Sequence, residues 1–179
     1  MLTTLAVIAF IAAAAIAIVL LFAAAKPDTF HVERSMAIAA PPERILPLID
    51  DFRNWRSWSP YEKLDPAMKR TLSGAESGKG AVYEWQGNGK AGQGRMEIAA
   101  ASPSKVAIDL RFLKPFRAHN LAEFRLEPQG GATKVTWAMD GKIPFVAKIM
   151  HTIFNMDRMI GKDFETGLAN LKTVAEKKG

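Results

Sequence analysis

The chain has 179 residues, of which 49% are hydrophobic and 10 are proline, with no cysteine and a formal charge of +6. Its length and composition indicate one folded domain with an appendage and exclude a disordered or low-complexity chain. The absence of cysteine excludes a disulfide framework, a thiol nucleophile and a thiolate metal site. The basic residues are too dispersed to identify an anionic partner.

The first segment, residues 1–25, is predicted to be a transmembrane helix or an uncleaved signal anchor. No side chain in it is charged, and about 20 apolar residues suffice to cross a bilayer. A cleavable signal peptide is the alternative, because Ala23 and Ala25 have the small-x-small spacing of a cleavage site. An uncleaved anchor is favoured, since the apolar run exceeds a signal-peptide core and no basic residue precedes it. Lys26 and Arg34 beyond the helix weakly favour a cytoplasmic domain in a single-pass protein.

A folded domain is predicted over residues 30–176, after a linker at 26–29 and before a tail at 177–179. Residues 30–39 alternate as a first strand, and prolines at 41 and 42 begin one or two short helices. Gly, Pro, Ser and Asn then separate a succession of strand-like runs, as in antiparallel hairpins. The runs are residues 68–74, 81–87, 91–101, 105–112, 120–128 and 133–141. Apolar residues recur every three or four positions from Val146 to Ala175, which predicts one long amphipathic helix opened by Pro144.

Two strands alternate clearly enough to assign their faces. Val106, Ile108, Leu110 and Phe112 are expected to point inward, as are Thr133, Val135, Trp137 and Met139. The charged residues between such apolar sets are expected on the solvated face, in cross-strand pairs. They are Glu84, Asp109, Arg111, Glu123 and Arg125.

The predicted order is a strand, short helices, six strands and a long helix, an α+β arrangement in which the helix covers the apolar face of a sheet. This order, with FHVERSMAIAAPPERILPLIDDFRNWRSWSPYEKLDP, GKGAVYEWQGN and MDRMIGKDFETGLANLK, resembles the SRPBCC superfamily, in its branch of polyketide cyclase/dehydrase-like proteins. The resemblance implies a START-like helix-grip fold, with a curved sheet of about seven strands around the C-terminal helix and a hydrophobic cavity between them. It also implies binding of lipids, sterols, polyketides or other apolar molecules, with catalysis in a minority of members.

No catalytic residue, metal site or cofactor is predicted. The histidines His31, His119 and His151 form no metal-binding spacing with a carboxylate. His151 is the best candidate for an acid or base, because it lies on the predicted long helix near Met150 and Phe154. A histidine at the margin of an amphipathic face is the simpler interpretation.

Large, adaptable apolar side chains favour a ligand-binding pocket as well as a packed core. The predicted ligand-binding residues are Trp58, Tyr61, Tyr83, Trp85, Met96, Phe112, Trp137, Met139, Met150 and Phe154. In the stretch DFRNWRSWSPYEK, Trp55 is expected to anchor the segment in the core, while Trp58 and Tyr61 border the cavity mouth. Arg53 and Arg56 are expected to hold the rim of that mouth against an anionic bilayer.

These observations favour a membrane-anchored binding module for a hydrophobic small molecule or lipid. An enzyme acting on a polyketide-like or lipid substrate and a protein-interaction or chaperone-associated module are the alternatives. Nucleic acid is not an expected partner, because the basic residues form no stripe and the aromatic side chains are expected to point inward. No protein partner is indicated.

Overall fold

The computed structural model describes residues 2–144, 148 and 156–177. Its elements follow the predicted order, with two 3₁₀-helices, η1 and η2, after the first short helix. The elements are α1 (Leu2–Ala25), β1 (Thr29–Ile38), α2 (Pro42–Asp50), η1 (Phe52–Ser57), η2 (Pro60–Lys63), β2 (Lys69–Gly74), β3 (Ala81–Gln86), β4 (Gln93–Ser102), β5 (Lys105–Lys114), β6 (Ala118–Gln129), β7 (Ala132–Lys142) and α4 (Met156–Ala175). The predicted long helix is confirmed from Met156 onward. Its expected first part lies outside the described residues, except for Pro144 and Lys148.

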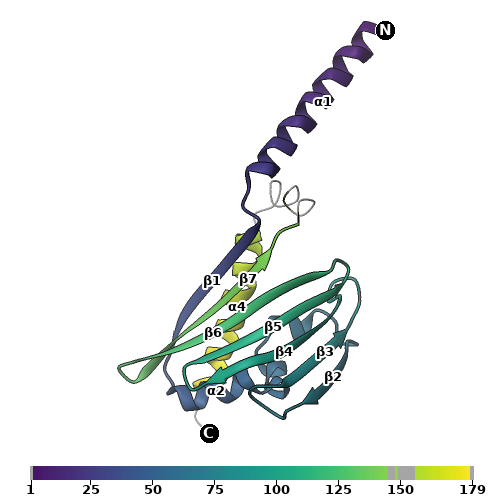
Figure 1. Cartoon of the computed structure of the whole chain (residues 1–179). Coiled ribbons are helices and arrows are strands. Elements are labelled where there is room, and N and C mark those ends of the chain that lie inside the picture. Colours follow the sequence, from purple (N-terminus) through teal and green to yellow (C-terminus); the bar gives the residue numbers. More distant parts are fainter. Residues whose placement is uncertain (1, 145–147, 149–155, 178–179) are drawn as a thin grey trace.

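The strands form one antiparallel sheet in the order β1-β7-β6-β5-β4-β3-β2. Each of the strands β2 to β6 is paired with the next strand along the chain, whereas β1 is paired with β7. Figure 1 shows α4 lying across one face of the curved sheet, with α2 at the end farther from α1. The fold is therefore the predicted α+β helix-grip arrangement of seven strands around a C-terminal helix.

The core lies between the sheet and α4, and the alternation of side chains along the strands places apolar residues there. Val106 and Ile108 on β5 are buried, as are Val135 and Trp137 on β7. Phe164, Leu168 and Leu171 recur along α4 and are each at most 1% exposed. This spacing puts the three side chains on one helical face, so the sheet and the helix bury matching apolar surfaces.

The aromatic segment after α2 donates hydrogen bonds to the last carbonyl groups of that helix. The last carbonyls of a helix have no partner within it and must find one elsewhere. Those of residues 47–50 accept hydrogen bonds from Asn54 Nδ2, Trp58 Nε1, Trp55 Nε1 and Gly78 N, in that order, at 2.8, 2.7, 2.8 and 2.8 Å. The two indoles are therefore held by directed contacts as well as by packing.

The helix α1 projects from the domain at the start of β1 (Figure 1). Residues Thr3–Ala25 are long and apolar enough to cross a membrane, by length and composition. Where the chain enters the domain, Lys148 Nζ donates to the carbonyl of Lys26 at 2.8 Å and lies 2.5 Å from a carboxylate oxygen of Asp28. Ile143 N also donates to the carbonyl of Asp28, at 2.7 Å. The junction between α1 and β1 is thus fastened to the segment that follows β7.

Candidate ligand-binding cavity

A cavity of about 890 Å³ lies between the sheet and α4. Strands β3 to β7 supply one wall, and η2, α4 and the start of β1 supply much of the rest. Small-molecule sites have volumes of about 300–1,000 Å³ and mostly apolar walls. The cavity therefore has the size and the lining of a site for an apolar molecule.

Most of the residues predicted to bind a ligand line this cavity. They are Tyr61, Tyr83, Trp85, Met96, Phe112, Trp137 and Met139. Met150 and Phe154, like the candidate acid or base His151, lie outside the described residues. That the seven lining side chains contact a ligand remains a prediction.

Trp55 is buried in the core as expected, whereas Trp58 does not lie at the cavity mouth. Trp58 is 1% exposed, does not line the cavity and packs against the rings of Trp55, Phe124 and Trp137. Trp55 lines the cavity wall. The prediction was wrong because the indole of Trp58 turns back to the carbonyl of Leu48, which takes it away from the cavity mouth.

Further lining residues were not included among the predicted ligand contacts. Ile108 and Leu110 line the cavity beside Phe112, and their alternation along β5 was a usable signal. Ile160 and Phe164 line it from α4, where a spacing of four places both on one face. Phe30, Leu64 and Met68 complete much of the apolar wall, and their isolated positions gave no comparable signal.

A buried polar cluster in one wall also escaped the sequence analysis. Glu62 on η2 accepts a hydrogen bond from the hydroxyl of Tyr83 at 2.5 Å and one from Arg70 Nε at 2.6 Å. Its side chain is only 7% exposed. Burial, together with the hydrogen bond to Glu62, raises the pKa of Tyr83, so this hydroxyl stays protonated and donates. The cluster ties η2 to β2 and β3 and leaves the carboxylate paired, so it fixes the wall rather than offering a free reactive group.

Three other polar groups lie in the wall, and two of them have no hydrogen-bond partner among the residues that the structure describes. Tyr61 has a pKa raised by burial and by the nearby charge of Asp163, so its hydroxyl stays protonated. Asn120 Oδ1 and Trp137 Nε1 are buried and unpaired within the described part of the chain. The wall therefore offers isolated hydrogen-bonding groups within a mainly apolar surface.

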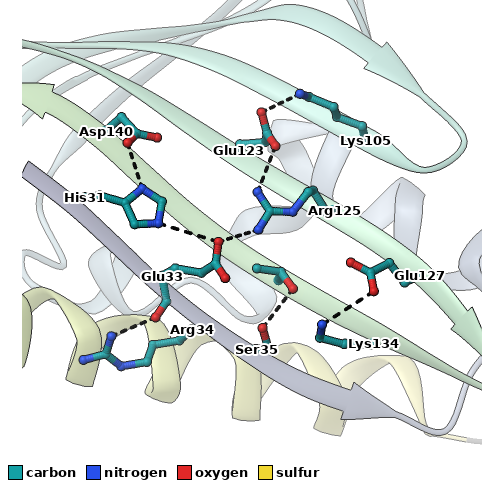
Figure 2. A network of polar contacts seen from close by, with 11 residues as sticks. His31, Glu33, Arg34, Ser35, Lys105, Glu123, Arg125, Glu127, Lys134 and Asp140 are labelled. Atoms are coloured by element: carbon teal, nitrogen blue, oxygen red, sulfur yellow. Dashed lines mark hydrogen bonds and ion pairs between the residues drawn. The ribbon is translucent and has the colours of Figure 1, made fainter.

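The face of the sheet away from α4 carries the charged residues expected there. Figure 2 shows Arg125 between Glu33 and Glu123, and Lys105 reaching Glu123. The Glu123–Lys105 contact is 2.6 Å long. These strands thus present apolar side chains to the cavity and a ladder of ion pairs to solvent, as predicted.

Two of the histidines belong to that outer face. His31 Nδ1 is 2.8 Å from Asp140, as drawn in Figure 2, and His119 Nε2 is 2.7 Å from Asp109. Arg111 forms a second contact to Asp109 at 2.7 Å, and its hydrogen bond is the main cause of the lowered pKa of that carboxyl group. No group of three or more His, Cys, Asp or Glu side chains is placed to hold a metal ion within the described ranges.

The cations at the cavity differ from the predicted ones. Arg53 is paired with Asp51 at 2.9 Å, and neither Arg53 nor Arg56 lines the cavity. Lys90, Arg117 and Lys142 line it instead. They come from the β3–β4 turn, the β5–β6 turn and the end of β7, so only the assembled sheet brings them to one rim.

The family model of polyketide cyclase / dehydrase and lipid transport proteins matches residues 29–176. The chain belongs to this family. The match and the fold together confirm the resemblance to the SRPBCC superfamily. No curated protein sequence matches the chain.

Several solved structures have the same fold as this family member, at low sequence identity. Protein CV1439 from Chromobacterium violaceum is 15% identical with a TM-score of 0.58, over 86% of this chain and 100% of its own. CalU16 from Micromonospora echinospora is 14% identical with a TM-score of 0.54, over 83% and 85%. DynU16, from the dynemicin biosynthetic locus, is 16% identical with a TM-score of 0.58, over 85% and 48%. Such identities establish a common fold, and function must be argued from the site.

Proposed function

We propose that this protein is a membrane-anchored binding module that holds a hydrophobic small molecule or a lipid between its sheet and α4. The observation that carries the proposal is the cavity of about 890 Å³ with its aromatic, methionine and aliphatic wall. Burying apolar surface contributes about 25 cal/mol per Å², so an apolar ligand of matching size gains affinity from most of its surface. Trp85, Met96 and Met139 supply rings and sulfur atoms that adapt to different ligand shapes.

The membrane part of the proposal rests on α1. A helix of this length and apolarity, attached at the start of β1, anchors the cavity beside the bilayer in which hydrophobic molecules are concentrated. The excess of cations beyond α1 weakly favours the cytoplasmic side. Lipid transport appears in the description of the family, and the dynemicin biosynthetic locus appears in that of DynU16. Both descriptions are compatible with an apolar cargo.

Filling the cavity tests the proposal. Ala122 lines it from β6 and is 5% exposed, so Ala122→Phe places a ring where the ligand is expected. The full chain, purified in detergent, is extracted with organic solvent, and the recovered small molecules are identified by mass spectrometry. We expect the wild type to retain a defined apolar compound and Ala122→Phe to lose most of it, because the ring occupies the ligand's volume.

The neighbouring residue provides the matched control. Leu121 is 45% exposed on the opposite face of β6, so Leu121→Phe adds a ring on the same strand outside the cavity and is expected to retain the compound. Circular dichroism confirms that each variant is folded. Equal amounts of compound in wild type and folded Ala122→Phe would show that the cavity is not the binding site.

A further inference from the structure

The cavity has an uneven distribution of charge. Among the described residues, three cations line it, Lys90, Arg117 and Lys142, and all three lie at the end of the sheet where β1 starts and β7 ends. Antiparallel pairing puts the β3–β4 and β5–β6 turns at that end. The two turns are in contact, since a Cβ atom on Gly92 would lie 2.4 Å from the carbonyl oxygen of Lys114. Side chains distant in sequence therefore share one rim.

Among the described residues, these three cations have no carboxylate partner of the kind that several other cations have. In the described part of the chain none of them forms an ion pair, whereas Lys105, Arg111 and Arg125 on the outer face each form one. Arg70, which does not line the cavity, is paired with the lining residue Glu62. The described lining includes two carboxylates, and one of them, Glu62, is ion-paired with Arg70. The other, Asp163, lies on α4 and has a pKa raised by partial burial. The rim therefore carries uncompensated positive charge at the opening of an apolar chamber.

We infer that the ligand is an anionic amphiphile, whose apolar chain fills the cavity and whose carboxylate or phosphate headgroup lies among Lys90, Arg117 and Lys142. This inference rests on the proposed function and adds the chemical class of the ligand. An anion deep in an apolar chamber is strongly disfavoured, but at the rim it remains partly hydrated. Ammonium and guanidinium groups give it there the short, charge-assisted hydrogen bonds that carboxylates and phosphates accept.

The test compares three probes with the same chain and different headgroups: dodecanoate, dodecanol and dodecylamine. The full chain is reconstituted in phosphatidylcholine nanodiscs at about pH 8, where the carboxyl group is ionised. Binding is measured by titration calorimetry against empty nanodiscs. We expect dodecanoate to bind about tenfold or more tightly than dodecanol, as charge-assisted contacts at the rim imply. Dodecylamine is expected to bind most weakly.

The decisive variant is Lys90→Gln/Arg117→Gln/Lys142→Gln. It is expected to bind dodecanoate no better than dodecanol while its affinity for dodecanol stays at the wild-type value. This result separates the headgroup contact from the integrity of the apolar chamber. The inference is overturned by equal affinities of the wild type for dodecanoate and dodecanol, or by an unchanged preference in the triple variant.

A control of equal charge is Arg56→Gln/Lys79→Gln/Lys177→Gln, whose side chains are exposed and do not line the cavity. It is expected to keep the preference for dodecanoate. A repeat in nanodiscs containing phosphatidylserine distinguishes ligand headgroups from bilayer headgroups. If the rim variant differs from wild type only in those nanodiscs, the cations dock the domain on lipid and the ligand assignment is wrong. If none of the three probes binds to the wild type, the proposed function itself fails.

Discussion

Trp58 and Trp137 are both almost completely buried, yet their indole N–H groups have different surroundings. Trp58 Nε1 donates to the carbonyl of Leu48 at 2.7 Å. Trp137 Nε1 has no partner among the described residues, and its ring is stacked on Phe164 with centroids 4.2 Å apart. A buried polar group left without a partner costs about 1–3 kcal/mol. Trp58 therefore contributes packing and a hydrogen bond, whereas Trp137 contributes packing alone.

The same substitution at both positions separates the two contributions. Both changes replace an indole with a smaller phenyl ring. Trp58→Phe also leaves the Leu48 carbonyl unpaired, whereas Trp137→Phe removes a donor that has no partner. We expect Trp58→Phe to lower the free energy of unfolding by about 1–3 kcal/mol more than Trp137→Phe does. Denaturant unfolding of the full chain in micelles, followed by near-ultraviolet circular dichroism, measures both. Equal losses at the two sites would assign Trp58 a purely apolar role.

Among the elements, α4 depends on two glycines where side chains of the sheet press against it. A Cβ atom at Gly167 would lie 2.6 Å from Cζ3 of Trp137. At Gly161 it would lie 2.0 Å from a guanidinium nitrogen of Arg34. The indole is confined by the packed core, whereas the guanidinium ends a flexible side chain that contacts Asp157 and Glu165 at the surface. The two positions therefore differ in how easily the neighbouring group moves aside.

Gly167→Ala is expected to be more destabilising than Gly161→Ala. Both changes gain about 1 kcal/mol of helix propensity, but only the first overpacks the core, at a cost of about 1–3 kcal/mol. We expect the difference in unfolding free energy to be about 1 kcal/mol or more, measured by the same denaturant unfolding. A shift of the near-ultraviolet signal in Gly167→Ala alone would report the displaced Trp137 ring. If Gly161→Ala is equally destabilising, the Arg34 side chain is held as firmly as the indole.

At the scale of the whole molecule, the proposed function requires α1 to hold the domain at a membrane. Two arginines near the middle of a spanning helix each cost about 2.5–3.5 kcal/mol on insertion scales. We expect Ile8→Arg/Ile16→Arg to shift the protein from the carbonate-washed membrane pellet to the supernatant. The same substitutions at exposed residues of the domain, Leu72→Arg/Leu121→Arg, are expected to leave it in the pellet. The intact mass of the wild-type chain from membranes is expected to include residues 1–25, and a chain starting at Lys26 would indicate a cleaved signal peptide.

Much of the fold was predictable because local patterns determine the elements. Alternation from Val106 to Phe112 reports one strand face directly, and the spacing of Phe164, Leu168 and Leu171 reports one helix face. The glycines and prolines between the strand runs marked the hairpins that place consecutive strands side by side. The patterns did not predict how the side chains of the segment after α2 are oriented. The indole directions of Trp55 and Trp58 depend on which carbonyls of that helix need partners.

The candidate site was less predictable, because it depends on contacts between distant segments. Periodicity identified Tyr83, Trp85 and Trp137 as inward-facing, but a period distinguishes neither a packed core nor a cavity wall. Glu62 and Arg70 lie on either side of a turn, and their pairing appears only when η2 packs against β2. The basic rim draws its members from two turns and a strand end, so no local sequence pattern marks it.

The junction after α1 has a further consequence for how a cargo travels. Only Lys26, Pro27 and Asp28 separate α1 from β1, a stretch that spans about 11 Å even when fully extended, and Lys148 grips it from the domain. With α1 in the bilayer, as proposed, this short connection keeps the domain beside the membrane surface. A domain anchored in this way does not diffuse through solution between two membranes. On the proposed function, the ligand is therefore taken from, and passed to, the same membrane surface or a partner that binds there.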